Sequence, residues 1–345
     1  MLLKKKEEIE NWLNQYNIEN YELIKDEEYG YIVDVSGNVE LQSKKLKSIE
    51  VKFNEINGNF YCEKNQLTSL EGSPKIVHGS FYCNDNQLTS LKYSPKKIKT
   101  QFNCSNNKLT SLEFAPEKTH DLIAYNNKLK NLNCKKIKIY GDFNVNFNQL
   151  SSLEDGPKHV GKNYSCHHDQ LTSLNGIQSF INGSFSCGYN QLTSLETFVK
   201  TVGEDFYCTN NQLTSLEGMP NVGASFNCSG NKLSSLKGIQ STIKGHFDCS
   251  NNQLTSLEDF PKNVDNTINI SNNQLIIKSM DFLPNYMKKI ICEGNPNLYE
   301  LQKVTESEEF KKTLIMLQNI LQNKMLLTTV VEKNIKNKKR NVSKI

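Results

Sequence analysis

Hydrophobic residues recur along most of this chain at an interval of about 21 residues. The stretch Phe-Tyr-Cys-Glu-Lys-Asn-Gln-Leu-Thr-Ser-Leu begins at Phe60, and close copies begin at Phe81 and Phe206. Phe-x-Cys alternates with period two, which predicts a short strand with both side chains on one face. Two leucines follow, five and eight residues after the cysteine, and we expect them to close a coil over that face. A fixed period of this length indicates a solenoid, in which each unit packs only on its neighbours.

We number each unit from its cysteine, or from the residue in the same place, and call this residue the anchor. The anchors are Leu41, Cys62, Cys83, Cys104, Ala124, Val145, Cys166, Cys187, Cys208, Cys228, Cys249, Ile270 and Cys292. They lie 21 residues apart, with 20 at two steps and 22 at the last, which makes 13 units. The first and last units are degenerate, as expected of units that face a cap instead of another unit.

Two polar or constrained columns accompany the hydrophobic ones. An asparagine stands three residues after nearly every anchor, with Asp169 and Lys44 as the exceptions. Its side chain both donates and accepts, so we expect it to satisfy backbone groups left unpaired by the turn after the strand and to bridge neighbouring coils. Prolines on the return segment predict an extended rather than helical chain there. They are Pro74, Pro95, Pro116, Pro157, Pro220 and Pro261.

The ten cysteines raise the question of disulfides or a metal site. Nine of them are anchors, and Ala124, Val145 and Ile270 fill the same column, so the position requires a small apolar group. A buried free cysteine behaves as such a group, and we expect thiols in the core. Stacked thiols would risk scrambled pairing in an oxidising compartment, which favours the cytoplasm. Cys134 lies outside the column, and the pattern assigns it no role.

The pattern Phe/Leu-x-Cys/Val-x-x-Asn-x-Leu-x-x-Leu resembles the core of the leucine-rich repeat. Asn-Gln-Leu-Thr-Ser-Leu-Glu-x-x-Pro resembles the short bacterial-type repeat of secreted effectors, and the phenylalanine and cysteine columns are similar to repeat proteins of phages and large DNA viruses. The resemblance covers about residues 37–302. It implies an α/β-class, right-handed leucine-rich-repeat solenoid with a curved parallel β-sheet on the concave face, a mostly extended convex side, and binding on the concave face.

The two ends of the chain depart from the repeat. Residues 1–36 are expected to form a small N-terminal cap, with a helix followed by two short strands over residues 21–35. The helical spacing is that of Ile9, Trp12, Leu13 and Tyr16. Residues 303–345 are expected to form a capping helix over about 306–332 and a basic tail from Lys333.

Bulk composition suits an elongated repeat protein. The chain is only 37% hydrophobic, its mean hydropathy is −0.58, and its net charge is +4, which suits a thin, elongated core and gives no field for nucleic acid or membrane as the main partner. Glutamates and lysines recur on the return segments, where we interpret them as solvated rows. No apolar run reaches the length of a membrane span or a signal peptide. We therefore expect a cytoplasmic protein, with a nuclear location as the alternative.

The predicted function is non-enzymatic protein–protein interaction, with an unknown protein partner, no small-molecule substrate, no cofactor and no metal. A catalytic domain with a nucleophilic cysteine, as some similar effectors carry, is not expected, because the residues after the last unit hold no Cys, His or Asp. The alternative is a nuclear or nucleic-acid-associated factor that acts through the basic tail.

Large aromatic and histidine side chains interrupt the predicted concave face, whose columns lie one before and one and two after the anchor. Other positions there are mostly Ser, Asn, Thr or Gly. Exposed aromatic side chains on a polar sheet are candidate partner anchors, although tyrosine also simply suits strands. The candidates are Tyr61, Tyr82, Tyr125, Phe147, His167, His168, Tyr189 and Tyr207. The pair His167-His168 does not predict a metal site, because consecutive strand residues point to opposite faces.

Overall fold

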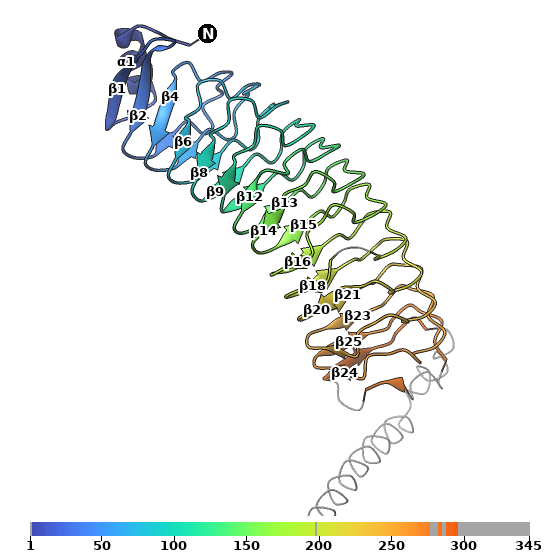
Figure 1. The fold of residues 1–345 in the computed structure, drawn as a ribbon. Helices are drawn as coiled ribbons and strands as arrows, with labels where there is room; N and C mark the ends of the chain where they lie inside the picture. Colours follow the sequence, from blue (N-terminus) through green and yellow to red (C-terminus); the bar gives the residue numbers. More distant parts are fainter. Residues whose placement is uncertain (1, 197–198, 277–281, 285–287, 296–345) are drawn as a thin grey trace, which may run out of the picture.

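The computed structural model describes residues 2–196, 199–276, 282–284 and 288–295, which form a long, gently bent stack of coils (Figure 1). One parallel sheet of 13 strands runs along the stack, with neighbouring strands contributed by consecutive coils. Its strands are β3 (Val39–Glu40), β5 (Phe60–Tyr61), β7 (Phe81–Tyr82), β9 (Gln101–Asn103), β11 (Asp121–Ile123), β13 (Phe143–Asn144), β15 (Tyr164–Ser165), β17 (Phe185–Ser186), β19 (Phe206–Tyr207), β21 (Phe226–Asn227), β23 (Phe247–Asp248), β25 (Thr267–Asn269) and β26 (Lys289–Ile291). The predicted register is confirmed, since each Phe column residue pairs with the next, as Phe60 does with Phe81.

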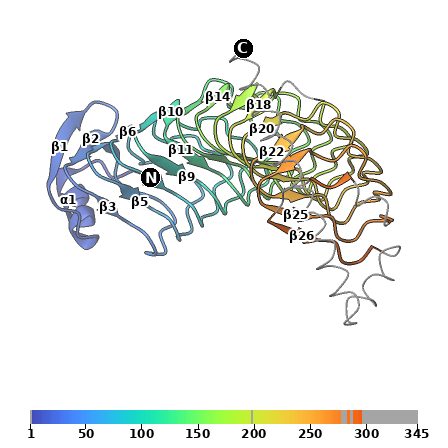
Figure 2. The same cartoon turned by 90° about the horizontal axis from the view of Figure 1, so that it is seen from below.

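A second row of short strands, which the sequence pattern did not predict, lies beside this sheet (Figure 2). One sheet contains β4 (Phe53–Ile56), β6 (Ile76–Val77), β8 (Lys97–Ile98), β10 (Lys118–Thr119), β12 (Lys138–Ile139) and β14 (His159–Val160). Two smaller sheets continue the row with β16 (Phe180–Ile181), β18 (Thr201–Val202), β20 (Asn221–Val222), β22 (Thr242–Ile243) and β24 (Asn263–Val264). The return segment is therefore extended, as predicted, but it also forms a hydrogen-bonded ladder of its own.

The hydrophobic columns fill the space enclosed by the coils. All anchors except the half-buried Cys292 are buried, as are the two leucines that follow in the central coils. The phenylalanine rings stack from coil to coil, with centroids 5.2 Å apart between Phe60 and Phe81 and 5.4 Å apart between Phe185 and Phe206. Burial of one such side chain stabilises the fold by about 1.5–3 kcal/mol before entropy is counted. Each coil supplies too few of these to fold without neighbours.

The asparagine column forms a ladder that joins each coil to the previous one. The Asn65 amide nitrogen donates to the carbonyl oxygens of Leu41 and Cys62, at 2.8 and 3.1 Å. Its side-chain oxygen accepts from the backbone N–H groups of Lys44 and Leu46, at 3.0 and 2.9 Å. Equivalent bonds repeat along the stack, as at Asn211 and Asn252. The predicted bridging role of this column is confirmed.

The N-terminal segment packs on the first coils. Helix α1 (Lys6–Gln15) buries Ile9, Trp12 and Leu13, and the Trp12 ring lies 6.2 Å from that of Phe53. Strands β1 (Tyr21–Asp26) and β2 (Gly30–Val35) form an antiparallel hairpin, and β2 pairs with β4 in parallel. That this segment serves as a cap stays a prediction.

The predicted capping helix at 306–332 and the basic tail lie outside the described residues. Within the part of the chain that the structure describes, no helix has the length and apolar character needed to cross a membrane.

Candidate functional site

The outward face of the 13-stranded sheet, called the main face here, consists of the columns three and one before the anchor and one after it. From Asn59 to Ser250 these columns contain Glu63, Asp121, Asp142, Asp205 and Asp248 but no lysine. Serine and asparagine occupy most other places. The main face is thus polar and carries only negative formal charge over ten coils.

The eight sequence candidates do not form one continuous site. Tyr61 and Tyr82 stack in neighbouring coils, with parallel rings 5.2 Å apart. Tyr207 is tied to its own strand, since its hydroxyl donates to Asp205 at 2.9 Å, and burial together with this carboxylate raises its pKa to about 12. Tyr125 is half-buried, and the ring contacts among the described residues do not include it, although its coil neighbours that of Phe147.

The remaining four candidates form one cluster, called the aromatic stack, which consists of Phe147, His167, His168 and Tyr189. His167 stands in a main-face column, and the other three stand in the adjoining column, two after the anchor. The His168 ring lies between those of Phe147 and Tyr189, at centroid distances of 4.4 and 4.1 Å and nearly parallel to both. His167 packs edge-on against Phe147 and His168, at 5.1 and 5.0 Å. Phe147 and Tyr189 remain 48% and 51% exposed. The cluster thus leaves two aromatic side chains half-exposed to solvent.

The backbone under the aromatic stack is strained. Phe147, His168 and Tyr189 have φ values of 55°, 57° and 54°, in the left-handed region, where the equivalent residues of other coils are mainly Asn, Asp or Gly. A left-handed conformation costs a residue with a large side chain about 1–2 kcal/mol. Stacking of the rings offsets a part of this cost, about 0.5–1.5 kcal/mol per pair. Strain kept in three successive coils, with the rings left exposed, favours a binding role for them.

Burial and the neighbouring His168 lower the pKa of His167, which favours its neutral form. Among the described residues no group of three or more His, Cys, Asp or Glu side chains is arranged to hold a metal ion.

Asp169 lies directly after the stack and replaces an asparagine of the ladder. Its Oδ1 accepts from the backbone N–H of Leu150 at 3.0 Å, as the asparagines do, but its buried Oδ2 has no hydrogen-bond partner. Burial raises the pKa of Asp169 to about 7. The other ladder residues place an amide NH₂ group where Asp169 places an oxygen.

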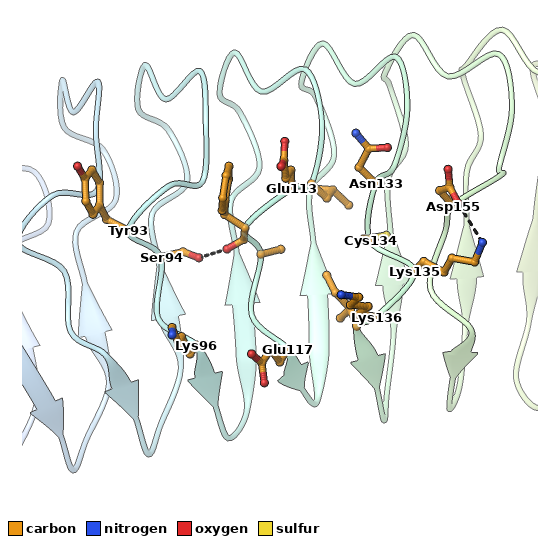
Figure 3. A pocket seen from close by; sticks show the side chains of 14 residues that line it. Tyr93, Ser94, Lys96, Glu113, Glu117, Asn133, Cys134, Lys135, Lys136 and Asp155 are labelled. Carbon is orange, nitrogen blue, oxygen red and sulfur yellow. Dashed lines mark hydrogen bonds and ion pairs between the residues drawn. The ribbon is translucent and has the colours of Figure 1, made fainter.

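A hollow on the return loops was missed by the sequence interpretation. It has a volume of about 710 Å³, and the half-exposed side chains of Tyr93 and Phe114 line it. Figure 3 shows Tyr93 at one end of the hollow and Asp155 at the other. Both residues stand ten positions after their anchors and have φ values of 70° and 66°. Several other coils place a glycine at this position, such as Gly72 and Gly176. The glycine column and its two aromatic interruptions were readable in the sequence and would have marked this place.

Cys134 forms part of the same hollow (Figure 3). It is buried, and burial raises the pKa of its thiol far above the usual range, so the thiolate form is disfavoured. The coil that contains it lacks the proline of its neighbours, and Asn133 takes up the left-handed conformation one residue early. Cys134 therefore acts as a core residue of an irregular return loop.

No protein-family model matches the sequence, and no curated protein matches it either. Among solved structures, the chain is similar to YopM, a leucine-rich effector protein from Yersinia pestis, with 18% identity, a TM-score of 0.51, and 75% of this chain and 77% of that chain covered. It is also similar to the leucine-rich repeat domain of APL1B, with 16% identity, a TM-score of 0.56, and 87% and 92% covered. These likenesses, together with the parallel-strand solenoid, show that the chain has the leucine-rich-repeat fold.

Proposed function

We propose that this chain is a non-enzymatic scaffold that binds a protein partner on the face that the repeat pattern predicts to be concave, across the main face and the adjoining column of the aromatic stack. The observation that carries the proposal is the aromatic stack, in which bulky residues hold a left-handed backbone and leave their rings half-exposed. Aromatic side chains are enriched among the residues that dominate protein–protein binding. The fold shared with leucine-rich-repeat proteins, which present a rigid surface to protein partners, agrees with it.

The charge of the main face limits the kind of partner. Five carboxylates and no lysine occupy its three columns between Asn59 and Ser250, and the adjoining column of the aromatic stack adds one charge of each sign, Lys64 and Asp85. A partner with an apolar centre, to cover the exposed aromatic side chains, and a basic rim would be complementary to it. The pair Tyr61 and Tyr82 offers a second, smaller contact toward the N-terminal end.

We further propose a reducing compartment such as the cytoplasm as the place of action. The column of buried, free cysteines supports this location, because such thiols survive best where disulfides do not form.

The test is an affinity capture from the cells that produce the protein, followed by quantitative mass spectrometry. Wild type is compared with the variant Phe147→Asn/His168→Asn/Tyr189→Asn. Asparagine is the residue that Asn126 and Asn210 supply on either side of the stack, so the left-handed backbone is preserved. We expect a partner of the wild type to be lost from this variant.

A matched variant, Tyr61→Asn/Tyr82→Asn, removes aromatic area at the other end of the main face and is expected to weaken binding less. Capture of the same partner in the same amount by wild type and the triple variant would contradict the proposal.

A further inference from the structure

Three lysines and a histidine stand directly opposite one another on the second row of strands. Lys97 pairs with Lys118, Lys118 with Lys138, and Lys138 with His159, across strands β8, β10, β12 and β14. All four side chains are exposed. At about 4.8 Å per strand, this lysine row is about 14 Å long.

The lysine row works against stability. Like charges directly opposite each other on neighbouring strands repel, and an uncharged residue at any of these exposed positions would relieve the repulsion. Within the described residues, Lys97, Lys118 and Lys138 have no carboxylate within ion-pair distance. The later strands of the same row begin with Phe180, Thr201, Asn221, Thr242 and Asn263 instead. Among the described strands of this row, lysines that pair directly with one another are thus confined to one stretch.

The hollow of Tyr93 and Phe114 opens at the beginning of this stretch. Lys96, which lines the hollow, directly precedes Lys97, and Lys136, which also lines it, lies two residues before Lys138 (Figure 3). Its volume is within the range of about 300–1,000 Å³ that is usual for ligand sites. Two strained, half-exposed rings therefore flank a hollow that adjoins a row of unpaired cations.

We propose that this surface binds single-stranded nucleic acid, with the phosphate backbone along the lysine row and an unstacked base against the rings of Tyr93 and Phe114. Sites for single strands combine a cationic track for the phosphates with aromatic side chains on which bases stack. This surface is distinct from the main face and independent of the function proposed for it.

The aromatic rings favour nucleic acid over an acidic protein segment. Lysines alone attract any polyanion, but a carboxylate-rich peptide gives no reason for two exposed rings held in a left-handed backbone beside them. Glu113, Glu117 and Asp155 also line the hollow, and Asp155 already pairs with Lys135 at 3.3 Å. Carboxylates accept hydrogen bonds from the amino groups of bases, so they are compatible with a base but not with a second phosphate.

The test is fluorescence anisotropy of the full chain with labelled 12-nucleotide oligo(U) and oligo(A), as RNA and as DNA, over a series of salt concentrations. In Lys97→Gln/Lys118→Gln/Lys138→Gln we expect affinity at low salt to fall at least about tenfold. The slope of log affinity against log salt should become shallower by about 2, because about 0.7 is lost for each phosphate contact to a single strand.

A matched control removes the same charge from positions that directly flank the later strands of this row. Lys200→Gln/Lys244→Gln/Lys262→Gln changes three exposed lysines outside the stretch and should bind as wild type does. Any contribution of the basic tail is common to all these chains. Tyr93→Gly/Phe114→Gly restores the residue of other coils, so it should fold, and should lose about fivefold or more in affinity through lost stacking.

Three results would overturn the proposal. The first is that wild type shows no saturable binding at low salt, and the second is that the two lysine variants lose affinity equally. The third is that polyglutamate displaces the labelled oligonucleotide as effectively as unlabelled oligonucleotide does. The last result would assign the surface to an acidic protein.

Discussion

Replacement of Asp169 by asparagine should stabilise this protein, and by an amount that depends on pH. In the wild type, one carboxylate oxygen of Asp169 is buried without a partner, whereas the asparagines of neighbouring coils, Asn148 and Asn190, each donate from this place to three carbonyl oxygens. The variant Asp169→Asn would keep the bond from the Leu150 N–H and supply the missing donor.

The size of the effect follows from the pKa of Asp169. Burial raises this pKa from 3.8 to about 7 in the folded protein. The folded state prefers the protonated acid. The contribution of Asp169 to the free energy of unfolding is therefore complete below pH 3.8, falls as the pH rises toward 7, and stays low above pH 7. A difference of about three pKa units corresponds to about 4 kcal/mol, of which about 2–3 kcal/mol is lost between pH 5 and pH 8.

The measurement is urea unfolding followed by circular dichroism at pH 5 and pH 8 for both chains. Histidines also titrate in this range, but they are common to both chains, so the difference between the two pH effects isolates Asp169. We expect wild type to lose about 2–3 kcal/mol more than Asp169→Asn does between these pH values. The reverse change, Asn252→Asp, should introduce a similar loss at pH 8. Equal pH effects in wild type and Asp169→Asn would refute the reasoning.

The remaining predictions concern the core and the ladder. Leu213→Asp should destabilise the fold by more than about 4 kcal/mol, because it places a charge at a fully buried site, whereas Thr214→Asp at the exposed neighbour should melt as wild type does. Asn211→Ala should cost about 1–3 kcal/mol in urea unfolding, since it leaves the Leu192 N–H unpaired, and an unchanged midpoint would contradict the ladder. In thiol labelling with Ellman's reagent, the half-buried Cys292 should react first and the fully buried anchor cysteines only on unfolding.

Much of the fold was predictable because the repeat turns one local pattern into many aligned copies. The anchors, the phenylalanines and the paired leucines are buried as their columns predicted, and the ladder asparagines bridge coils. The exception Asp169 was visible in the sequence, but its unpaired oxygen was not, because hydrogen-bond satisfaction depends on neighbours 19 to 24 residues away.

The candidate site was predictable only in part. Tyr125 and Tyr207 share the predicted columns with the other candidates, yet the structure brings together only Phe147, His167, His168 and Tyr189, and separately Tyr61 and Tyr82. Two rings make contact only when their columns and their coils both bring them together. Contact also depends on the backbone conformation, which residue type alone does not specify.

The sequence by itself determined that the chain is a repeat, where each unit begins, and which side chains form its core, because hydrophobic periodicity dictates burial. Tertiary structure decided how charge is distributed. The net charge of +4 conceals a main face whose charged side chains between Asn59 and Ser250 are all carboxylates and, on the second row of strands, three lysines in register. Strands of two residues are too short to be recognised from their pattern, and side chains about 20 residues apart become neighbours only when the coils stack.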